Sequence, residues 1–227
     1  MRTSAKEPAR ATWVEEPARA TWVKICGVTR VEDARAAFAA GADAIGINFW
    51  PGSKRYCGPD RAREITASLA PGQVAYGVFV RAGRGEIEAM VRDCGLGGVQ
   101  FHGGEPEAET VGWDLPVIRA VAATSREAVV TALAAARERD RARYRVLVDN
   151  AAGGGSGRLI ETELLDGIDL GGAVLAGGLT PRNVAASVAR FRPFGVDTAG
   201  GVESGPGVKD AALVEAFVRE AKSGAAG

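Results

Sequence analysis

The sequence predicts a single α/β domain, a (β/α)8 TIM barrel in which parallel strands close into a cylinder inside a ring of helices. Short apolar runs alternate with segments of helical spacing from residue 21 to the C-terminus, which is typical of a parallel sheet covered on both faces. We count eight such runs, whereas a doubly wound sheet usually needs only about five or six strands. The chain has 227 residues, and α/β barrels of about 250 residues commonly form one domain.

Each strand is predicted from a short, mostly apolar run that is bounded by Gly, Pro, Asp or Asn. Runs of this length are too short for an ordinary helix and match strands that are buried on both faces. In chain order the predicted strands cover residues 22–26, 44–49, 74–80, 98–102, 117–121, 145–149, 173–176 and 195–198. Segments with helical spacing or composition lie between them, at residues 32–40, 61–69, 86–94, 125–139, 181–190 and 209–222.

The first residues carry a short duplication. The octet Glu-Pro-Ala-Arg-Ala-Thr-Trp-Val stands at residues 7–14 and again at residues 16–23. Repeat architectures need units of about 20–50 residues, and only the second copy runs into a predicted strand. We therefore expect residues 1–20 to be a disordered N-terminal extension and residues 21–227 to form the barrel.

Charge and cysteine content argue against several classes of partner. The chain has 28 basic and 28 acidic residues, so it lacks the basic excess of a protein that binds nucleic acid or an anionic membrane. No apolar stretch approaches the roughly 20 residues that cross a bilayer. The three cysteines, Cys26, Cys57 and Cys94, are unclustered, which argues against a disulfide framework and for a reducing compartment. We expect a soluble cytoplasmic protein, monomeric or homodimeric, that acts on a small molecule.

Polar residues and glycine clusters gather at the ends of the predicted strands. In a (β/α)8 barrel the active site lies at the carboxyl-terminal ends of the strands, where Cys26, Asn48, His102 and Asp149 stand. Glycine clusters follow the last three strands, at residues 153–157, 177–178 and 200–201. Glycine lets backbone N–H groups approach an anion, and barrels commonly bind phosphate after strands seven and eight. The sequence therefore predicts a phosphorylated substrate despite the zero net charge.

A series of motifs, in order from about residue 22 to the C-terminus, resembles those of the phosphoribosylanthranilate isomerase family. The most specific are Lys-Ile-Cys-Gly at 24–27, Gln-Phe-His-Gly at 100–103 and Leu-Ala-Gly-Gly-Leu at 175–179. The others include Ser-Lys-Arg-Tyr at 53–56, Leu-Val-Asp at 147–149, Gly-Val-Glu at 201–203 and Gly-Val-Lys-Asp at 207–210.

This resemblance implies a barrel of the ribulose-phosphate-binding type and an isomerase of tryptophan biosynthesis. The family converts N-(5-phosphoribosyl)anthranilate to 1-(2-carboxyphenylamino)-1-deoxyribulose 5-phosphate by an Amadori rearrangement, without metal or organic cofactor. Opening the ribose ring needs an acid, and removing the C2′ proton needs a base. By resemblance Cys26 is the general base and Asp149 the general acid. Cys26 then needs surroundings that favour its thiolate, and Asp149 needs surroundings that favour its protonated form.

The resemblance also implies contacts with the substrate. Arg55 matches the family's arginine for the anthranilate carboxylate, which a planar donor fork fits well. His102, Asn48 and Asp197 are expected in the substrate pocket, with a structural role as an equal alternative for Asp197. Phosphate is assigned to the glycine-rich loops, at Gly154, Gly155, Ser156, Gly157, Gly177, Gly178, Gly200 and Gly201.

Two phosphate loops depart from the family pattern. The usual Ser-Ser-Gly-Val-Glu after the last strand is Ala-Gly-Gly-Val-Glu at residues 199–203, which lacks two hydroxyls. After the sixth strand, Gly-Gly-Ser-Gly at 154–157 is followed by Arg158, where the family usually has Gly-Gly-Thr-Gly and an aromatic residue. Each lost hydrogen bond is worth about 0.5–3 kcal/mol, so we expect activity with weaker substrate binding.

Two other functions stay open on the sequence. One is another phosphosugar barrel enzyme, such as an epimerase or the aminoimidazole-carboxamide ribotide isomerase. The latter is expected to use two aspartates, so Cys26 argues against it. The other is a catalytically silent homologue with a binding role, which the changed phosphate loops suggest. Intact Cys26 and Asp149 argue against that alternative.

Overall fold

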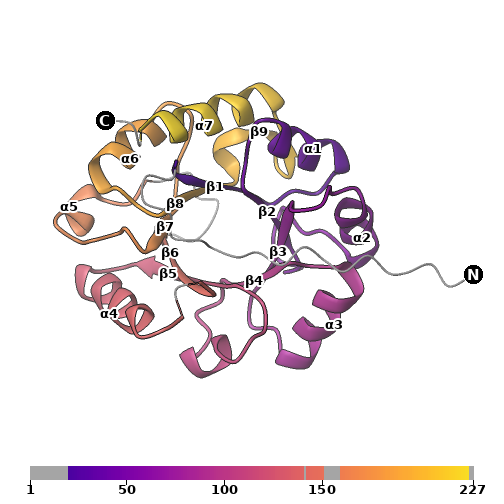
Figure 1. Ribbon diagram of the computed structural model, residues 1–227, viewed down its shortest axis with the longest axis horizontal. Coiled ribbons are helices and arrows are strands. Elements are labelled where there is room, and N and C mark those ends of the chain that lie inside the picture. The colour runs from indigo at the N-terminus through magenta and orange to yellow at the C-terminus, as the bar shows by residue number, and fades with distance from the viewer. Residues whose placement is uncertain (1–19, 141, 151–158, 225–227) are drawn as a thin grey trace, which may run out of the picture.

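The strands form one closed parallel barrel, as the sequence predicts (Figure 1). The computed structural model describes residues 20–140, 142–150 and 159–224. Each strand of this part pairs with the next in sequence, and β8 closes the barrel on β1, with Trp22 opposite Gly195. The bounds are β1 Trp22–Cys26, β2 Ala44–Asn48, β3 Val74–Phe79, β4 Gly98–Phe101, β5 Val117–Ala123, β6 Tyr144–Asn150, β7 Ala173–Leu175 and β8 Gly195–Thr198.

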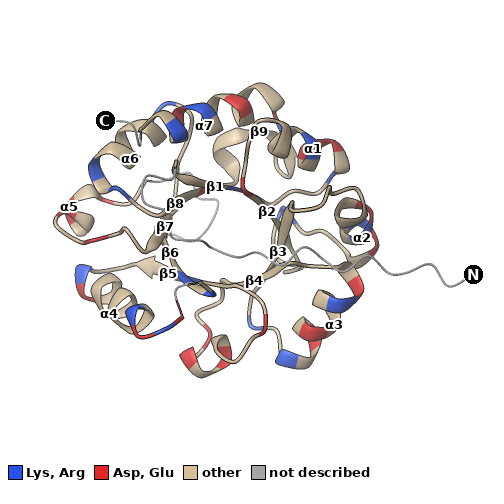
Figure 2. Cartoon of the chain, in the orientation of Figure 1, with Lys and Arg blue, Asp and Glu red and all other residues tan. Residues whose placement is uncertain are grey.

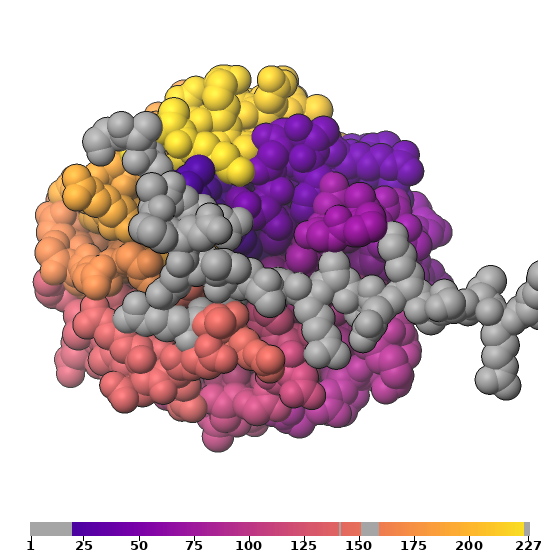
Figure 3. Space-filling model, viewed as in Figure 1, coloured from indigo at the N-terminus to yellow at the C-terminus, as the bar shows by residue number. Residues whose placement is uncertain are grey.

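Helices surround the barrel (Figure 1). The six predicted ones are present and begin within three residues of the expected positions: α1 Val31–Ala39, α2 Pro59–Ala67, α3 Arg84–Cys94, α4 Arg126–Arg137, α6 Val184–Phe191 and α7 Ala211–Ser223. Helix α7 packs against α1 and α6, so the two ends of the described chain lie side by side, as the yellow and indigo segments of Figure 3 show. This contact completes the outer ring beside the seam between β1 and β8.

Several short elements were not predicted. They are η1 Glu107–Thr110 between β4 and β5, α5 Thr162–Leu165 after β6, and η2 Gly200–Val202 with the hairpin β9 Glu203–Gly205 and β10 Val208–Lys209 after β8. The expectation that a helix begins at residue 209 was wrong, because Lys209 ends β10 and Asp210 is the N-cap of α7. The Asp210 carboxylate accepts the N–H groups of Ala212 and Leu213, which satisfies two donors of the first turn.

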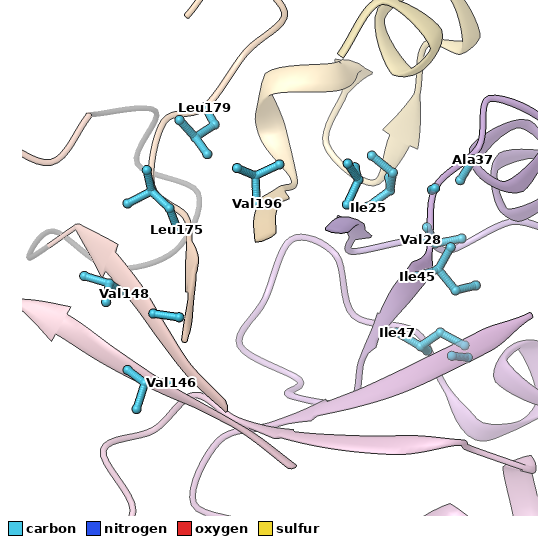
Figure 4. Close-up of a cluster of buried hydrophobic side chains, with 14 of the residues drawn as sticks. Ile25, Val28, Ala37, Ile45, Ile47, Val146, Val148, Leu175, Leu179 and Val196 are labelled. Carbon is cyan, nitrogen blue, oxygen red and sulfur yellow. The ribbon is translucent and has the colours of Figure 1, made fainter. Parts of the chain in front are cut away.

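Alternate residues of each strand face opposite sides of the barrel wall. Ile25, Ile45, Val148 and Val196 belong to the apolar layer between strands and helices (Figure 4). A second apolar cluster, which includes the first residues of β1, β2 and β3, lies in the barrel interior: Trp22, Ala44, Val74, Tyr76, Ile118, Leu147, Val174 and Ala176. Burying a side chain of the Ile or Leu kind stabilises the fold by about 1.5–3 kcal/mol. This cluster occupies one end of the interior together with the buried Arg145, whose guanidinium lies 4.1 Å from the ring centre of Phe194. The polar residues of the cavity described below lie at the other end.

Charged residues of both signs stand on the outer helices, for example on α3 and α4 (Figure 2). None of the helices in the described part of the chain is both long enough and apolar enough to span a membrane. The predicted N-terminal extension, residues 1–20, falls outside the described residues except for residue 20. The boundary between this extension and the barrel, at residues 20 and 21, stays a prediction.

Candidate active site

A cavity of about 700 Å³ opens at the carboxyl-terminal ends of the strands, where the sequence predicts the site. Every predicted site residue within the described ranges lines it: Cys26, Asn48, Arg55, His102, Asp149, Gly177, Gly178, Asp197, Gly200 and Gly201. The predicted phosphate residues Gly154, Gly155, Ser156 and Gly157 lie outside the described residues. Strands far apart in sequence thus bring the predicted residues to one cavity.

Cys26 ends β1 and lies beside Gly46 of β2, its register partner. A Cβ atom placed on Gly46 would stand 2.7 Å from the Cys26 Sγ and 3.2 Å from the Lys24 Nζ, so the missing side chain makes room for both groups. Burial raises the pKa of the Cys26 thiol, and the ammonium of Lys24 acts in the opposite direction. The thiolate that a base role for Cys26 requires is thus disfavoured by burial and favoured by the nearby ammonium of Lys24.

Lys24 is a fully buried lysine inside the barrel, one side-chain layer below Cys26. Its Nζ lies 2.8 Å from Oδ1 of Asp197 on the neighbouring β8. Burial acts to lower the pKa of Lys24, but Asp197 and Cys26 together raise it above its ordinary value. An unpaired charge inside a protein is very costly, so the ion pair is what allows an ammonium group to lie next to the thiol. Asp197 thus both lines the cavity and holds Lys24.

Asp149 is buried at the end of β6 and contacts the only histidine of the chain. Its Oδ2 lies 3.2 Å from Nε2 of His102, and its Oδ1 accepts the backbone N–H of Asn150 at 2.8 Å. Nε2 of Gln100, from the buried face of β4, lies 2.9 Å from Nδ1 of His102. With the amide donating to Nδ1, the imidazole carries its hydrogen on Nε2 and donates it to Asp149. These contacts fix the orientation of the carboxyl group.

Arg55 extends from the loop after β2 and forms a two-point ion pair. Its Nε and Nη2 each lie 2.7 Å from one carboxylate oxygen of Glu203, the first residue of β9. Gly27 makes this route possible, since a Cβ there would stand 2.4 Å from Cδ of Arg55. Two of the five N–H groups of the guanidinium are thereby used, and three stay available for a ligand.

Asn48 shapes the loop that carries Arg55. Its Oδ1 accepts the backbone N–H of Trp50 at 2.9 Å, and its Nδ2 donates to Oγ of Ser53 at 3.2 Å. That hydroxyl oxygen in turn accepts the backbone N–H of Arg55 at 3.1 Å. The sequence-based expectation placed Asn48 in the substrate pocket, and the geometry adds that it organises the loop at residues 49–56.

The loops after β7 and β8 need glycine for steric reasons. Gly177 and Gly178 have φ angles of 81° and 69°, a region that other residues rarely adopt. A Cβ on Gly201 would stand 1.9 Å from the carbonyl oxygen of Leu179, so the two loops are in direct contact. The hydroxyl of Thr198 donates to the same carbonyl at 2.8 Å. Both loops thus line the same side of the cavity with closely packed backbone.

Sequence reasoning missed four polar residues of this region: Lys24, Gln100, Glu203 and Lys209. Lys24 and Lys209 have fully buried side chains, and Gln100 is fully buried. The available signal was a polar residue inside a predicted buried strand, because such a residue needs a buried partner. Lys24 and Gln100 both meet that criterion.

Comparison with known proteins gives a consistent result. The family model described as N-(5'phosphoribosyl)anthranilate (PRA) isomerase matches residues 23–220. A Myxococcus xanthus protein named N-(5'-phosphoribosyl)anthranilate isomerase is 46% identical over 204 residues, which is 88% of this chain and 95% of its own length.

Solved structures agree in fold and sequence. The phosphoribosyl anthranilate isomerase of Thermotoga maritima is 34% identical, with a TM-score of 0.79 over 89% of this chain and 99% of that one. Another such isomerase, solved with reduced 1-(o-carboxyphenylamino)-1-deoxyribulose 5-phosphate, is 32% identical with a TM-score of 0.73, over the same shares of the two chains. On this evidence the chain belongs to the N-(5'-phosphoribosyl)anthranilate isomerase family.

Proposed function

We propose that the protein converts N-(5-phosphoribosyl)anthranilate to 1-(2-carboxyphenylamino)-1-deoxyribulose 5-phosphate, an Amadori rearrangement, in L-tryptophan biosynthesis. The observation that carries the proposal is that Cys26 of β1 and Asp149 of β6 line one cavity with Arg55 and the glycine loops. A thiol and a carboxyl group on separate strands supply one base and one acid to a substrate that lies between them. The alternative enzyme with two catalytic aspartates would not have a cysteine at the position of Cys26. A catalytically silent homologue would have no need to keep both Cys26 and Asp149 in the cavity.

The first step opens the ribose ring. The lone pair of the anthranilate nitrogen forms a double bond to C1′, the bond from C1′ to the ring oxygen breaks, and that oxygen takes a proton. We assign the proton to Asp149. His102 and the backbone N–H of Asn150 hold the carboxyl group from two sides, so that the acid is oriented before the substrate arrives.

The second step moves a proton from C2′. The thiolate of Cys26 takes this proton, the electron pair of the bond forms a double bond between C1′ and C2′, and the nitrogen recovers its lone pair. The Cys26 thiol then returns its proton to C1′ while the enol hydroxyl gives its proton to the Asp149 carboxylate, which leaves a ketone at C2′ and restores both groups to their starting states. Burial disfavours the thiolate and the nearby ammonium of Lys24 favours it, so we assign Lys24 the role of counter-cation to Cys26.

The two anionic ends of the substrate need separate sites. For the anthranilate carboxylate we assign the guanidinium edge of Arg55 that Glu203 leaves open. For the phosphate we assign the backbone N–H groups around Gly177, Gly178, Gly200 and Gly201. A related isomerase structure holds reduced 1-(o-carboxyphenylamino)-1-deoxyribulose 5-phosphate, which supports a substrate of this size and charge for the family. For location we propose the cytoplasm, since the cysteines are free thiols.

The proposal is tested by identifying the product. Substrate made fresh from anthranilate and ribose 5-phosphate carrying 13C at C1 is incubated with the protein and followed by NMR. The anomeric carbon signal should give way to that of a methylene carbon bonded to nitrogen, and the gene should restore growth to a tryptophan auxotroph that lacks this isomerase. A stable anomeric signal together with no growth would refute the proposal and favour a silent homologue.

A further inference from the structure

Three largely buried charges, Arg55, Glu203 and Lys209, join the two proposed anion sites, and the proposed reaction leaves Glu203 and Lys209 without a role. The Glu203 cluster consists of Arg55, Glu203 and Lys209, whose side chains are 15%, 6% and 0% exposed. The Glu203 carboxylate takes Arg55 on both oxygens at 2.7 Å and Nζ of Lys209 on Oε1 at 2.8 Å. The same Oε1 accepts the backbone N–H of Gly207 at 3.3 Å.

Glu203 orients Arg55 and leaves one edge of its guanidinium free to bind a second anion. It occupies the edge of the guanidinium formed by Nε and Nη2, and the edge formed by Nη1 and Nη2 is geometrically suited to a second carboxylate. Glu203 is also held in place by Lys209 and Gly207, so it does not move freely with the arginine. The lowered pKa of Glu203, which Arg55 and Lys209 cause against the effect of burial, keeps the carboxylate charged.

Lys209 connects the same carboxylate to the phosphate loop. Its Nζ donates to the carbonyl oxygen of Ala199 at 3.0 Å, and Ala199 immediately precedes the η2 turn at Gly200–Val202. A Cβ on Gly200 would stand 3.0 Å from Nη2 of Arg55, so the turn and the arginine are also close neighbours. The cluster therefore connects the arginine to the phosphate loop through direct contacts.

We propose that Glu203 is a positioning residue that sets the spacing of the two anion sites, by fixing Arg55 for the anthranilate carboxylate and, through Lys209, the loop that receives the phosphate. The inference rests on the proposed function. A purely structural Glu203 would affect stability and turnover in general, whereas a positioning Glu203 affects recognition of the carboxylate and of the phosphate together.

The test compares Glu203→Gln with Arg55→Met in two measurements. Recognition of the carboxylate is the ratio of KM for the anthranilate substrate to KM for the aniline analogue, which lacks the carboxylate. Recognition of the phosphate is the Kd of inorganic phosphate, measured by calorimetry without substrate. The control is Asp43→Asn, which removes a partly buried carboxylate that pairs with Lys222 next to β2. If Glu203→Gln does not fold, Glu203→Asp, which keeps the charge but shortens the reach, takes its place.

For Glu203→Gln we expect the preference for the carboxylate to fall at least about tenfold and the Kd of phosphate to rise at least about threefold, because charge-assisted contacts are lost. Arg55→Met should lose the same preference but leave the Kd of phosphate within about twofold. Unchanged values of both quantities in Glu203→Gln, or changes in kcat and Tm alone, would overturn the inference. Absence of turnover by the unsubstituted protein would refute the proposed function instead, while the phosphate measurement would still be informative.

Discussion

Replacing Lys24 with methionine removes the positive charge closest to the proposed base while nearly preserving side-chain volume. The ammonium lies next to Cys26 inside the barrel and is paired with Asp197 at 2.8 Å. Without it, burial and the carboxylate of Asp197, both of which raise the pKa of Cys26, act on the thiol with less opposition. The variant should therefore hold a smaller fraction of thiolate at neutral pH.

The size of the effect follows from the geometry around Gly46. The positions of Sγ and Nζ relative to that residue place the two atoms within about 6 Å of each other. At an effective dielectric constant of about 20, a pair of unit charges at this distance interacts by about 3 kcal/mol. That energy corresponds to a roughly hundredfold loss of thiolate, and kcat/KM should fall by a similar factor at pH 7.5.

The assay follows the disappearance of anthranilate fluorescence on fresh substrate between pH 6 and pH 10. For the unsubstituted protein kcat/KM should rise with pH, because the base is active only after a thiol with a raised pKa loses its proton. In Lys24→Met the rise should occur at higher pH, so that the deficit shrinks as the solution becomes more alkaline.

The double variant Lys24→Met/Asp197→Asn is the control. An ionised Asp197 without its partner is strongly destabilising, so the double variant should be more stable than the single one and recover part of the activity. A single variant that retains kcat/KM within threefold of the unsubstituted protein, with the same pH profile, would refute the assignment of Lys24 as counter-cation.

Three further predictions follow from single positions. Ala199→Ser restores a hydroxyl to the phosphate loop and should lower KM about two- to tenfold in steady-state kinetics; an unchanged KM would mean that the altered loop does not weaken binding. Gly201→Ala pushes a Cβ against the Leu179 carbonyl at 1.9 Å and should cost about 1–3 kcal/mol in urea unfolding, so a variant of unchanged stability would contradict the geometry. Burial raises the pKa of Cys57 from 9.0 to about 11. Since the unfolded thiol ionises first, this contribution to stability is complete below about pH 9 and declines by about 1.4 kcal/mol per pH unit up to pH 11. Cys57→Ala should lessen the decline of the unfolding free energy between pH 9 and pH 11. The same decline in the variant and the unsubstituted protein would contradict this prediction.

The barrel could be predicted because its strands are buried on both faces and therefore read as apolar runs. The site could be located because strand ends such as Cys26 and Asp149 meet at one end of any such barrel. The prediction was wrong at Lys209, where a charged residue before an amphipathic segment resembles a helix start. In the structure this lysine is buried beneath Glu203, a tertiary contact that local spacing does not reveal.

The ion pairs of the site could not be predicted for a related reason. Arg55 and Glu203 are separated by 148 residues, and their contact depends on how the β2 loop and the β9 hairpin converge after the barrel closes. The electrostatic surroundings of Cys26 could not be predicted either, because the balance between burial and the Lys24 cation depends on distances that only the fold sets.

The most direct test of the central claim is the time course of anthranilate fluorescence with the unsubstituted protein, Cys26→Ala and Asp149→Ala under identical conditions. Fluorescence of fresh substrate should disappear rapidly with the unsubstituted protein and persist with both variants at the uncatalysed rate. Normal turnover by both variants would contradict the roles assigned to Cys26 and Asp149, and persistence with all three proteins would contradict the isomerase activity itself.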